Sequence, residues 1–383
     1  MGLPADLLQG GYAGLLRPVL FNAHGGDPEA IHEQLIAILA GVGDTPPLRG
    51  LLGLVSASRG KSAEVAGVRF PNRVGLAAGM DKDGLAALAW AALGFGFAEL
   101  GTVTAQPQPG NDRPRVFRLR DSHALINRMG FNNHGAAALV RTLAGAGIVR
   151  GNLAAGIPLG ISIGKTKLVE VPDAVADYLA SLDAVAPYAD YVAINVSSPN
   201  TPNLRTLQDG GALAELTTAL VARARTIPED SRPIPGVGSQ DRVSKGTPGR
   251  NPVPIFVKIA PDLGWGQIDE VLAACEAAGI AGMIATNTTL GRDGLAAADA
   301  GVAGQAGGLS GAPLTARALE VVRYVTGHTG LPVIGAGGIM TGDDAMRMFD
   351  AGAALIQLYT GFIYHGPGLI AAINAADTRR YPR

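Results

Sequence analysis

The segment YVAINVSSPNTPN, residues 191–203, contains the pattern that decides the fold. Its first half is a near-continuous apolar run, which suits a strand buried on both faces of a parallel sheet. Serine, threonine and asparagine follow directly after that run. In parallel α/β folds the active site forms at the carboxyl ends of the strands. We therefore expect residues 191–198 to form a parallel strand that ends in functional side chains.

Seven further segments share this pattern. They are RVGLAAG (73–79), FAELGTVT (97–104), PLGISIG (158–164), PIFVKIA (254–260), AGMIATNT (281–288), PVIGAGG (332–338) and ALIQLYTG (354–361). Stretches of helical character lie between them, such as 172–186 and 266–278. Eight strand–helix alternations predict an α/β fold of the (β/α)8 TIM-barrel type. A doubly wound open sheet is the alternative, which the number of units and the lack of an early GxGxxG motif disfavour.

Length and composition fit one large barrel with additions. The chain has 383 residues, of which 47% are hydrophobic, and a formal net charge of −1. This charge balance argues against binding nucleic acid through overall charge, and the apolar content excludes wholesale disorder. The single cysteine excludes an intramolecular disulfide and any multi-cysteine metal site. The six histidines lack HExxH spacing, so we expect no metal, and we expect no hydrolase elbow.

Residues 1–45 differ from the rest and are predicted to form a small N-terminal helical extension. Asp27-Pro28-Glu29 has the character of a helix start, with a capping aspartate and an early proline. Apolar residues follow at helical spacing, and Gly41 or Gly43 is expected to end the helix. This extension either packs on the main domain or offers an apolar face to lipid or a lipid-like substrate. No 18-residue apolar run and no signal-peptide pattern is present.

Residues 46–383 are assigned to the barrel, with one interruption. The segment 228–254 is rich in proline and glycine, lacks periodicity and precedes the fifth strand. We interpret it as a mobile surface insertion at the end of the barrel opposite the site.

The predicted strand ends carry a consistent set of polar groups. Lys82, Asn195, Lys258 and Asn287 all fall at such ends, where a purely structural barrel has little use for them. GAGG (335–338), YTG (359–361) and GGLSG (307–311) are glycine-rich and lie where barrels commonly bind phosphate. We therefore expect a phosphate-bearing cofactor.

Neutral amides dominate the candidate site. Asn127, Asn195, Asn200 and Asn287 offer paired donors and acceptors, which suit a planar amide-bearing ring such as a pyrimidine. Lys82 can hold an anionic group on that ring. Lys258 can place positive charge beside the N1/C2 edge of a flavin.

Seven motifs in order give the chain a resemblance to a known family. They are GLAAGMDKDG (75–84), GTVTAQPQPGNDRPRVFR (101–118), INRMGFNN (126–133), NVSSPNTPNLR (195–205), ATNTT (285–289), GGLSG (307–311) and GAGGI with LYTGF. The chain resembles the dihydroorotate dehydrogenases of the membrane-associated, quinone-using class over nearly its whole length. The resemblance implies FMN-dependent oxidation of (S)-dihydroorotate to orotate in pyrimidine (UMP) synthesis.

The resemblance also implies site residues. FMN would contact Ala78, Gly79, Met80, Asp81, Lys82, Thr102, Asn195, Lys258, Thr286, Gly311, Gly338, Tyr359 and Thr360. Ser162 joins them, although many relatives carry asparagine there. Dihydroorotate would meet Lys82, Asn127, Arg128, Met129, Gly130, Phe131, Asn195, Asn200, Asn287 and Thr288.

Ser198 matches the family's catalytic base. The soluble class uses cysteine for this task, but Cys275 shares a helical face with apolar residues and is expected in the core. A serine hydroxyl is a poor base unaided, so a proton relay is needed. Thr201 and an ordered water are the candidates, with Phe131 shielding the path.

The electrons that the flavin takes up must then pass to a final acceptor. No second nucleotide-binding motif or cysteine cluster is present that would pass them to NAD. The resemblance gives residues 1–45 the role of a quinone tunnel and membrane contact, with Arg118 near the quinone head. It implies a monomer bound peripherally at the cytoplasmic face of the cell membrane, with no nucleic-acid partner.

Rival functions differ in the residues they need. A 2-hydroxy acid oxidase would want a histidine base and arginine clamps, and a tRNA dihydrouridine synthase would want a basic surface and a cysteine acid. A non-redox phosphate-binding barrel that uses Lys258, or a non-catalytic membrane-associated protein, would carry no flavin.

Overall fold

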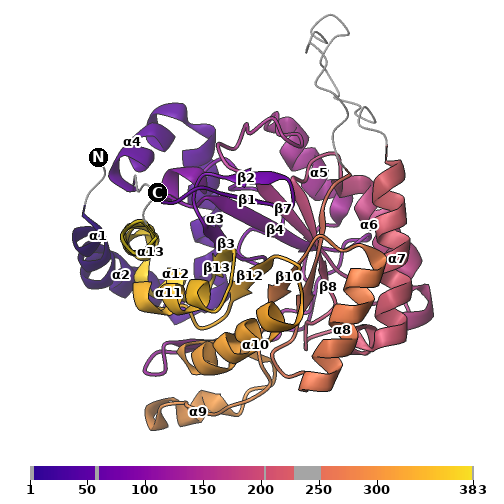
Figure 1. Ribbon diagram of the computed structural model, residues 1–383. Coiled ribbons are helices and arrows are strands. Elements are labelled where there is room, and N and C mark those ends of the chain that lie inside the picture. Colours follow the sequence, from indigo (N-terminus) through magenta and orange to yellow (C-terminus); the bar gives the residue numbers. More distant parts are fainter. Residues whose placement is uncertain (1–3, 57–59, 202–203, 228–251, 382–383) are drawn as a thin grey trace, which may run out of the picture.

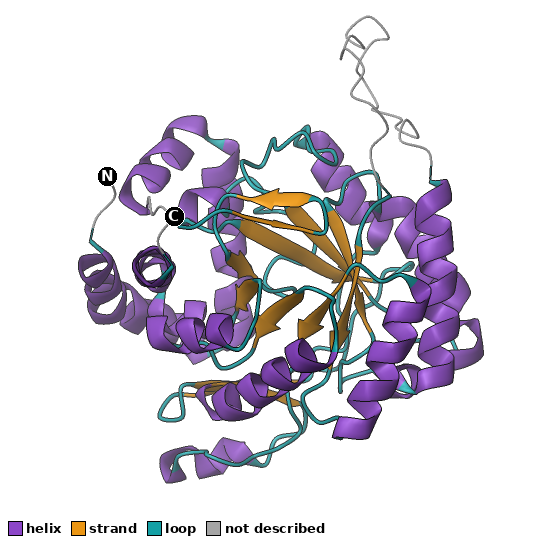
Figure 2. Ribbon diagram, in the orientation of Figure 1, coloured by secondary structure: helices purple, strands orange, loops and turns teal. Residues whose placement is uncertain are grey.

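The computed structural model describes residues 4–56, 60–201, 204–227 and 252–381. Nearly all of the expected insertion at 228–254 therefore lies outside the described residues. Helices surround a central group of strands, as Figure 2 shows.

Eight parallel strands close into a barrel, which confirms the (β/α)8 prediction. They are β3 (Val74–Leu76), β4 (Phe97–Val103), β7 (Leu159–Ile163), β8 (Tyr191–Asn195), β9 (Ile255–Ile259), β10 (Gly282–Ala285), β12 (Val333–Ala336) and β13 (Leu355–Leu358). The order around the barrel is β10-β12-β13-β3-β4-β7-β8-β9. Each strand lies within one of the eight predicted segments, and every strand residue is buried. In this register Asn195 lies beside Lys258.

An outer layer of helices covers the barrel (Figure 1). It comprises α5 (Ala136–Gly145), α6 (Ala174–Val185), α7 (Gly210–Thr226), α8 (Trp265–Ala278), α10 (Thr315–His328), α11 (Gly342–Asp350), α12 (Thr360–His365) and α13 (Pro367–Arg380). A short helix, α9 (Ala300–Ala303), lies outside this layer. Cys275 on α8 is fully buried in the core, as predicted, and burial raises the pKa of its thiol to about 12. A thiol in this position cannot serve as the base.

Aromatic rings fill the amino-terminal end of the barrel. Phe97 packs edge-on against Phe70 at 5.1 Å between ring centroids, and Tyr191 packs similarly against Phe256 at 5.3 Å. Glycine makes room for these rings, because a Cβ on Gly75 would lie 2.2 Å from Phe97. A hairpin of β1 (Ala63–Val65) and β2 (Val68–Phe70) supplies Phe70.

A small antiparallel sheet is the element that the strand count does not predict. It pairs β5 (Val116–Leu119), β6 (Ala124–Asn127) and β11 (Gly308–Gly311) in the order β11-β6-β5. β6 ends at Asn127, and β11 carries Gly308 and Gly311 of the GGLSG motif. The sheet thus brings two distant motifs of the sequence together beside the barrel.

The helical extension consists of α1 (Ala5–Gly11), a π-helical turn (Tyr12–Leu16), α2 (Arg17–Asn22), α3 (Pro28–Asp44) and α4 (Pro46–Ser56). Asp27 caps α3 as predicted, since its carboxylate accepts from the Glu29 N–H at 2.9 Å. α3 ends at Asp44, and α4 carries the helical extension beyond residue 45 to Ser56. α1 packs against α13 at one side of the barrel (Figure 1).

A buried ion pair fastens α3 to the barrel. The Arg115 guanidinium donates to both carboxylate oxygens of Glu29, at 2.7–3.1 Å.

In the described part of the chain no single helix is long and apolar enough to cross a bilayer. α3 and α4 meet the criterion only as a pair, with a bend of 107° between them.

Candidate active site

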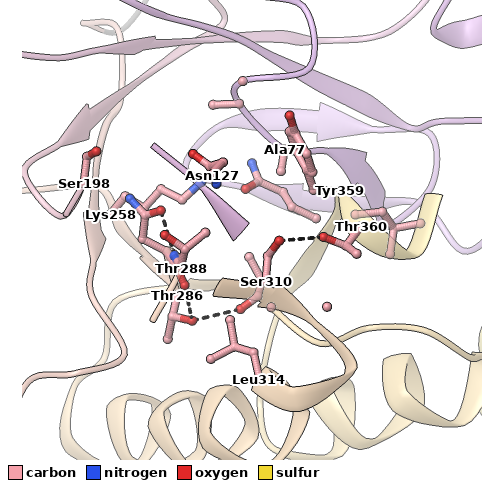
Figure 3. A pocket seen from close by; sticks show the side chains of 18 of the residues that line it. Ala77, Asn127, Ser198, Lys258, Thr286, Thr288, Ser310, Leu314, Tyr359 and Thr360 are labelled. Carbon is pink, nitrogen blue, oxygen red and sulfur yellow. Dashed lines mark hydrogen bonds between the residues drawn. The ribbon is translucent and has the colours of Figure 1, made fainter. Parts of the chain in front are cut away.

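A cavity lies at the carboxyl ends of the barrel strands. Its walls come from the ends of seven barrel strands and from the small antiparallel sheet. Figure 3 shows Ser198 on one side of the cavity and Thr360 on the other. The cavity is therefore where a barrel of this kind is expected to carry out its chemistry.

Most of the predicted site residues line this one cavity. They are Ala78, Gly79, Lys82, Thr102, Asn127, Met129, Gly130, Phe131, Asn195, Ser198, Asn200, Lys258, Thr286, Asn287, Thr288, Gly311, Gly338, Tyr359 and Thr360. They come from motifs spread over almost the whole chain, and only the closure of the barrel makes them neighbours.

Five predicted residues lie outside the cavity lining because their side chains are engaged elsewhere. Met80 is in the core, and Asp81 accepts from the Ala86 N–H and the Trp90 indole at 3.0 Å each. Ser162 hydrogen bonds to the Thr102 hydroxyl at 2.9 Å, so it supports a residue that does line the cavity.

Two arginines complete this group. The Arg128 guanidinium donates to Gln305 at 2.9 Å and lies over the ring of Phe117. Arg118 lies 4.0 Å from the ring centroid of Phe21 on α2, and burial lowers its pKa. Arg118 therefore faces the helical extension and lies outside the cavity lining.

Sequence reasoning missed several lining residues. Ser310 lies within the GGLSG motif, and its hydroxyl accepts from Thr360 at 2.8 Å. Gln357 lies in the middle of β13, where the amide is the only polar group in an apolar strand. Leu314, Ile339 and Met340 are apolar and carried no signal that separates them from the core.

The four predicted amides form two hydrogen-bonded pairs, which we call the amide array. Asn200 donates to Asn127 at 3.2 Å, and Asn287 donates to Asn195 at 3.2 Å. Asn195 in turn donates to the Thr102 hydroxyl at 3.0 Å. Each amide keeps further donor or acceptor capacity for a ring that carries both carbonyl and N–H groups.

The structure separates two adjacent serines. Ser197 is fully buried, and its hydroxyl is used by Asn287, which donates to it at 2.9 Å. Ser198 lines the cavity, and its oxygen accepts only a 3.3 Å bond from the Asn200 N–H among the described residues. Thr201, on the same loop, is buried with a hydroxyl that has no described partner.

Two lysines bring positive charge to the cavity. Burial lowers the pKa of Lys82, and Glu29 and Asp83 oppose this effect. Burial also lowers the pKa of Lys258, which Glu99 opposes from 4.0 Å. Within the described residues neither ammonium donates a hydrogen bond to a side chain, so both are available to an anionic ligand.

Arg205 ties together the loops that carry these groups. It donates to the Ser197 carbonyl at 3.1 Å, to the Thr288 carbonyl at 3.2 Å and to Asp262 at 2.8 Å. Asp262 also accepts from the Thr289 hydroxyl. The loops after β8, β9 and β10 are thus held in one arrangement beside the cavity.

The geometry can be compared with known proteins. The family model for dihydroorotate dehydrogenase matches residues 61–376, which include the whole barrel and every residue that lines the cavity. The chain belongs to the dihydroorotate dehydrogenase family. It is accordingly an oxidoreductase, which confirms the family and the enzyme class expected from the seven motifs.

Curated relatives of the dihydroorotate dehydrogenase family match over nearly the full length. A protein of Salinispora arenicola is 53% identical over 370 residues, covering 94% of this chain and 97% of its own length. One from Chloroflexus aurantiacus is 51% identical over 366 residues, covering 94% of each. Both are named dihydroorotate dehydrogenase (quinone).

A solved structure shows the same architecture. The dihydroorotate dehydrogenase of Eimeria tenella in complex with ferulenol has a TM-score of 0.78 and 33% identity, covering 94% of this chain and 93% of its own. The likeness extends over the helical extension as well as the barrel, since it covers nearly the full chain.

Proposed function

We propose that this chain oxidises (S)-dihydroorotate to orotate in pyrimidine synthesis, with FMN as hydride acceptor and a membrane quinone as final electron acceptor. The observation that carries the proposal is the cavity that combines Ser198, the amide array and two lysines. Curated relatives that match over nearly the full chain are named for this reaction and for quinone.

The residues present fit a flavin phosphate. Gly311 and Gly338 line the cavity with φ of 101° and 67°, which favour glycine. A Cβ on Gly311 would lie 2.3 Å from the His123 carbonyl, and one on Gly338 would lie 2.2 Å from Thr315. Glycine therefore lets the backbone itself form this wall, as phosphate sites require.

FMN would be held by Ala78, Gly79, Lys82, Thr102, Asn195, Lys258, Thr286, Gly311, Gly338, Tyr359 and Thr360. When bound, FMN supplies the two-electron acceptor that no side chain of the cavity provides. Lys258 would place a positive charge beside the flavin ring, where it stabilises the negative charge of the reduced form.

The amides and Lys82 bind and orient the substrate. Asn127, Asn200, Asn195 and Asn287 match the carbonyl and N–H groups of the dihydropyrimidine ring. Lys82 holds the substrate carboxylate as a charge-assisted partner. These contacts hold the substrate ring in a fixed orientation relative to Ser198, so that proximity and orientation contribute to catalysis.

Ser198 accepts the proton from C5 of dihydroorotate. Its hydroxyl lines the cavity and its oxygen is only weakly engaged, whereas that of Ser197 is committed to Asn287. The buried Thr201 hydroxyl has no described partner and is free to pass the proton on through a water. Phe131 lines the same wall and shields this path from bulk solvent.

The test is single-turnover reduction of the bound flavin by dihydroorotate under anaerobic conditions. We expect Ser198→Ala to slow reduction by at least 10²-fold, because general-base catalysis contributes about that much. Ser181→Ala, on α6 and outside the cavity lining, is the control and keeps a rate within a few-fold of the wild type. An unchanged rate in Ser198→Ala would remove this serine from the mechanism.

The helical extension supports the quinone and membrane part of the proposal. It exposes many large apolar side chains, among them Leu15, Val19, Leu51 and Leu54. Such a patch marks an interaction surface. Because the patch lies on the element that covers Arg118, we assign this element to quinone entry and to peripheral binding at the cytoplasmic face of the membrane.

A further inference from the structure

A buried carboxylate lies beneath the cavity, and the proposed reaction gives it no role. Glu99 is in β4, points into the barrel and is fully buried. Its Oε2 accepts from the Gln357 amide at 2.7 Å and from the Tyr191 hydroxyl at 3.1 Å. Its Oε1 has no hydrogen-bond partner among the described residues and lies 4.0 Å from Lys258 Nζ.

This arrangement is unusual for a purely structural polar cluster. An ionised carboxylate in the core costs several kcal/mol unless a counter-charge compensates it. Both neutral donors, Tyr191 and Gln357, bind the same oxygen, which leaves the other oxygen facing the ammonium of Lys258. Tyr191 stays a donor at any working pH, because burial and the nearby carboxylate raise its pKa well above the ordinary value.

Lys258 depends on this carboxylate. Its side chain is more than nine-tenths buried, and within the described residues it donates no hydrogen bond to another side chain. Glu99 from β4 is the only charged group that acts on it in this part of the chain. Asn195 on β8, which lies next to Lys258 in the register, presents a neutral amide. Burial lowers the pKa of Lys258, and Glu99 is the only group that raises it.

We propose that Glu99 is a positioning residue that keeps Lys258 as an ammonium at the floor of the cavity and thereby sets the reduction potential of the bound flavin. Gln357 fixes the orientation of the carboxylate through a 2.7 Å bond, and Tyr191 adds a longer second bond to the same oxygen. The inference rests on the proposed function, because it takes FMN to be the group above Lys258.

Two consequences follow when the charge of Glu99 is removed. While Lys258 keeps its proton, its field acts uncompensated and favours the reduced, anionic flavin. Once Lys258 loses its proton, the positive charge disappears and the reduced flavin loses its stabilising partner. The potential of Glu99→Gln should therefore fall below that of the wild type as pH rises.

The experiment measures the midpoint potential of the bound flavin between pH 6 and 9 in the wild type, Glu99→Gln and Tyr191→Phe. We expect an additional break in the profile of Glu99→Gln. On its alkaline side the preference for reduced flavin falls roughly tenfold, which is about 30 mV for two electrons. Tyr191→Phe removes a donor from the same carboxylate but keeps its charge, so its profile follows the wild type.

Three results would overturn the inference. Coincident profiles for the wild type and Glu99→Gln would show that the carboxylate has no influence. A potential raised uniformly over the whole range would show that Lys258 keeps its proton without Glu99. An equal break in Tyr191→Phe would show that disruption of the cluster, not its charge, causes the change.

A second measurement does not need flavin. Unfolding midpoints of Glu99→Gln, Lys258→Met and the double variant test the pairing itself, because the double variant leaves neither buried charge uncompensated. We expect the double variant to be more stable than either single variant, even if a single variant fails to fold. Additive losses would overturn the pairing. Absence of flavin from the purified wild type would instead overturn the proposed function.

Discussion

The ion pair between Glu29 and Arg115 allows a quantitative test of how the extension is held. The two side chains are 4% and 6% exposed, and the guanidinium also donates to the carbonyls of Pro109 and Asn111 at 2.7 and 2.6 Å. In Glu29→Gln the arginine stays buried without its counter-charge. Breaking a buried pair in this way costs about 3–5 kcal/mol.

A matched exposed pair lies on the same helix and loop. Glu33 and Arg113 are 54% and 52% exposed, with 2.5 Å between their atoms. An exposed pair contributes about 0–1 kcal/mol, so Glu33→Gln should change the free energy of unfolding by less than 1 kcal/mol. The two variants remove the same chemical group from one helix and differ in burial and in the second bond of Glu29, which also pairs with the exposed Arg113 at 3.1 Å.

Urea unfolding is the assay. With a slope of about 3 kcal/mol per molar, typical of the upper range, Glu29→Gln should lower the midpoint by roughly 1 M. Limited proteolysis should show faster cleavage within residues 28–44, because α3 loses its anchor. Equal midpoints for Glu29→Gln and Glu33→Gln would refute the reasoning, since burial would then not decide the contribution of the pair.

Three further predictions follow from contacts of the site and the extension. Arg205→Ala should slow flavin reduction by dihydroorotate about 10²-fold and raise the KM for dihydroorotate, because the Ser198 and Thr288 loops lose their shared anchor. Reoxidation of the flavin by quinone should stay unchanged. Arg223→Ala, which breaks an exposed pair with Asp183, is the control, and equal reduction rates in the two variants would contradict the prediction. The double variant Leu51→Glu with Leu54→Glu should no longer sediment with anionic vesicles but should still show flavin reduction. Leu153→Glu, on a barrel loop, should keep both vesicle binding and flavin reduction. Vesicle binding by the double variant would show that the membrane contact lies on another part of the protein. Burial raises the pKa of Asp81 from 3.8 to about 6, so the folded state holds a proton that the unfolded state releases. The stability that this proton contributes is present below pH 4 and is lost as pH rises through 6. Urea midpoints should therefore show the wild type losing up to about 3 kcal/mol against Asp81→Asn between pH 4 and 7, and parallel pH profiles of the two proteins would refute this.

The barrel could be predicted because its strands satisfy a strong physical constraint. A strand covered on both faces must be apolar over most of its length, and all eight segments met that condition despite single polar residues such as Glu99, Lys258 and Gln357. The sheet of β5, β6 and β11 escaped prediction because β11 pairs with β6 from a distant part of the chain. No local pattern records such pairing.

The boundary of the extension was harder to place for a related reason. Gly41 and Gly43 suggested an end to α3, but the helix continues to Asp44 and α4 follows after one residue. Gly43 is buried against Leu88 and Ala89 of the barrel, where a Cβ would lie 3.2–3.3 Å from their atoms. A glycine that permits close packing looks the same in sequence as one that ends a helix.

Within the site motifs, residue type could be predicted but direction could not. Consecutive side chains on extended backbone point to opposite sides, so a motif supplies the cavity with only some of its members. Lys82, Asn127 and Ser198 line the cavity, while their neighbours Asp81, Arg128 and Ser197 turn into the protein. Those neighbours do not line the cavity, yet each holds a loop beside it: Asp81 through Trp90, Arg128 through Gln305 and Ser197 through Asn287. Substituting such a neighbour should therefore change the position of the lining residue, and a rate loss there is no proof of contact with the substrate.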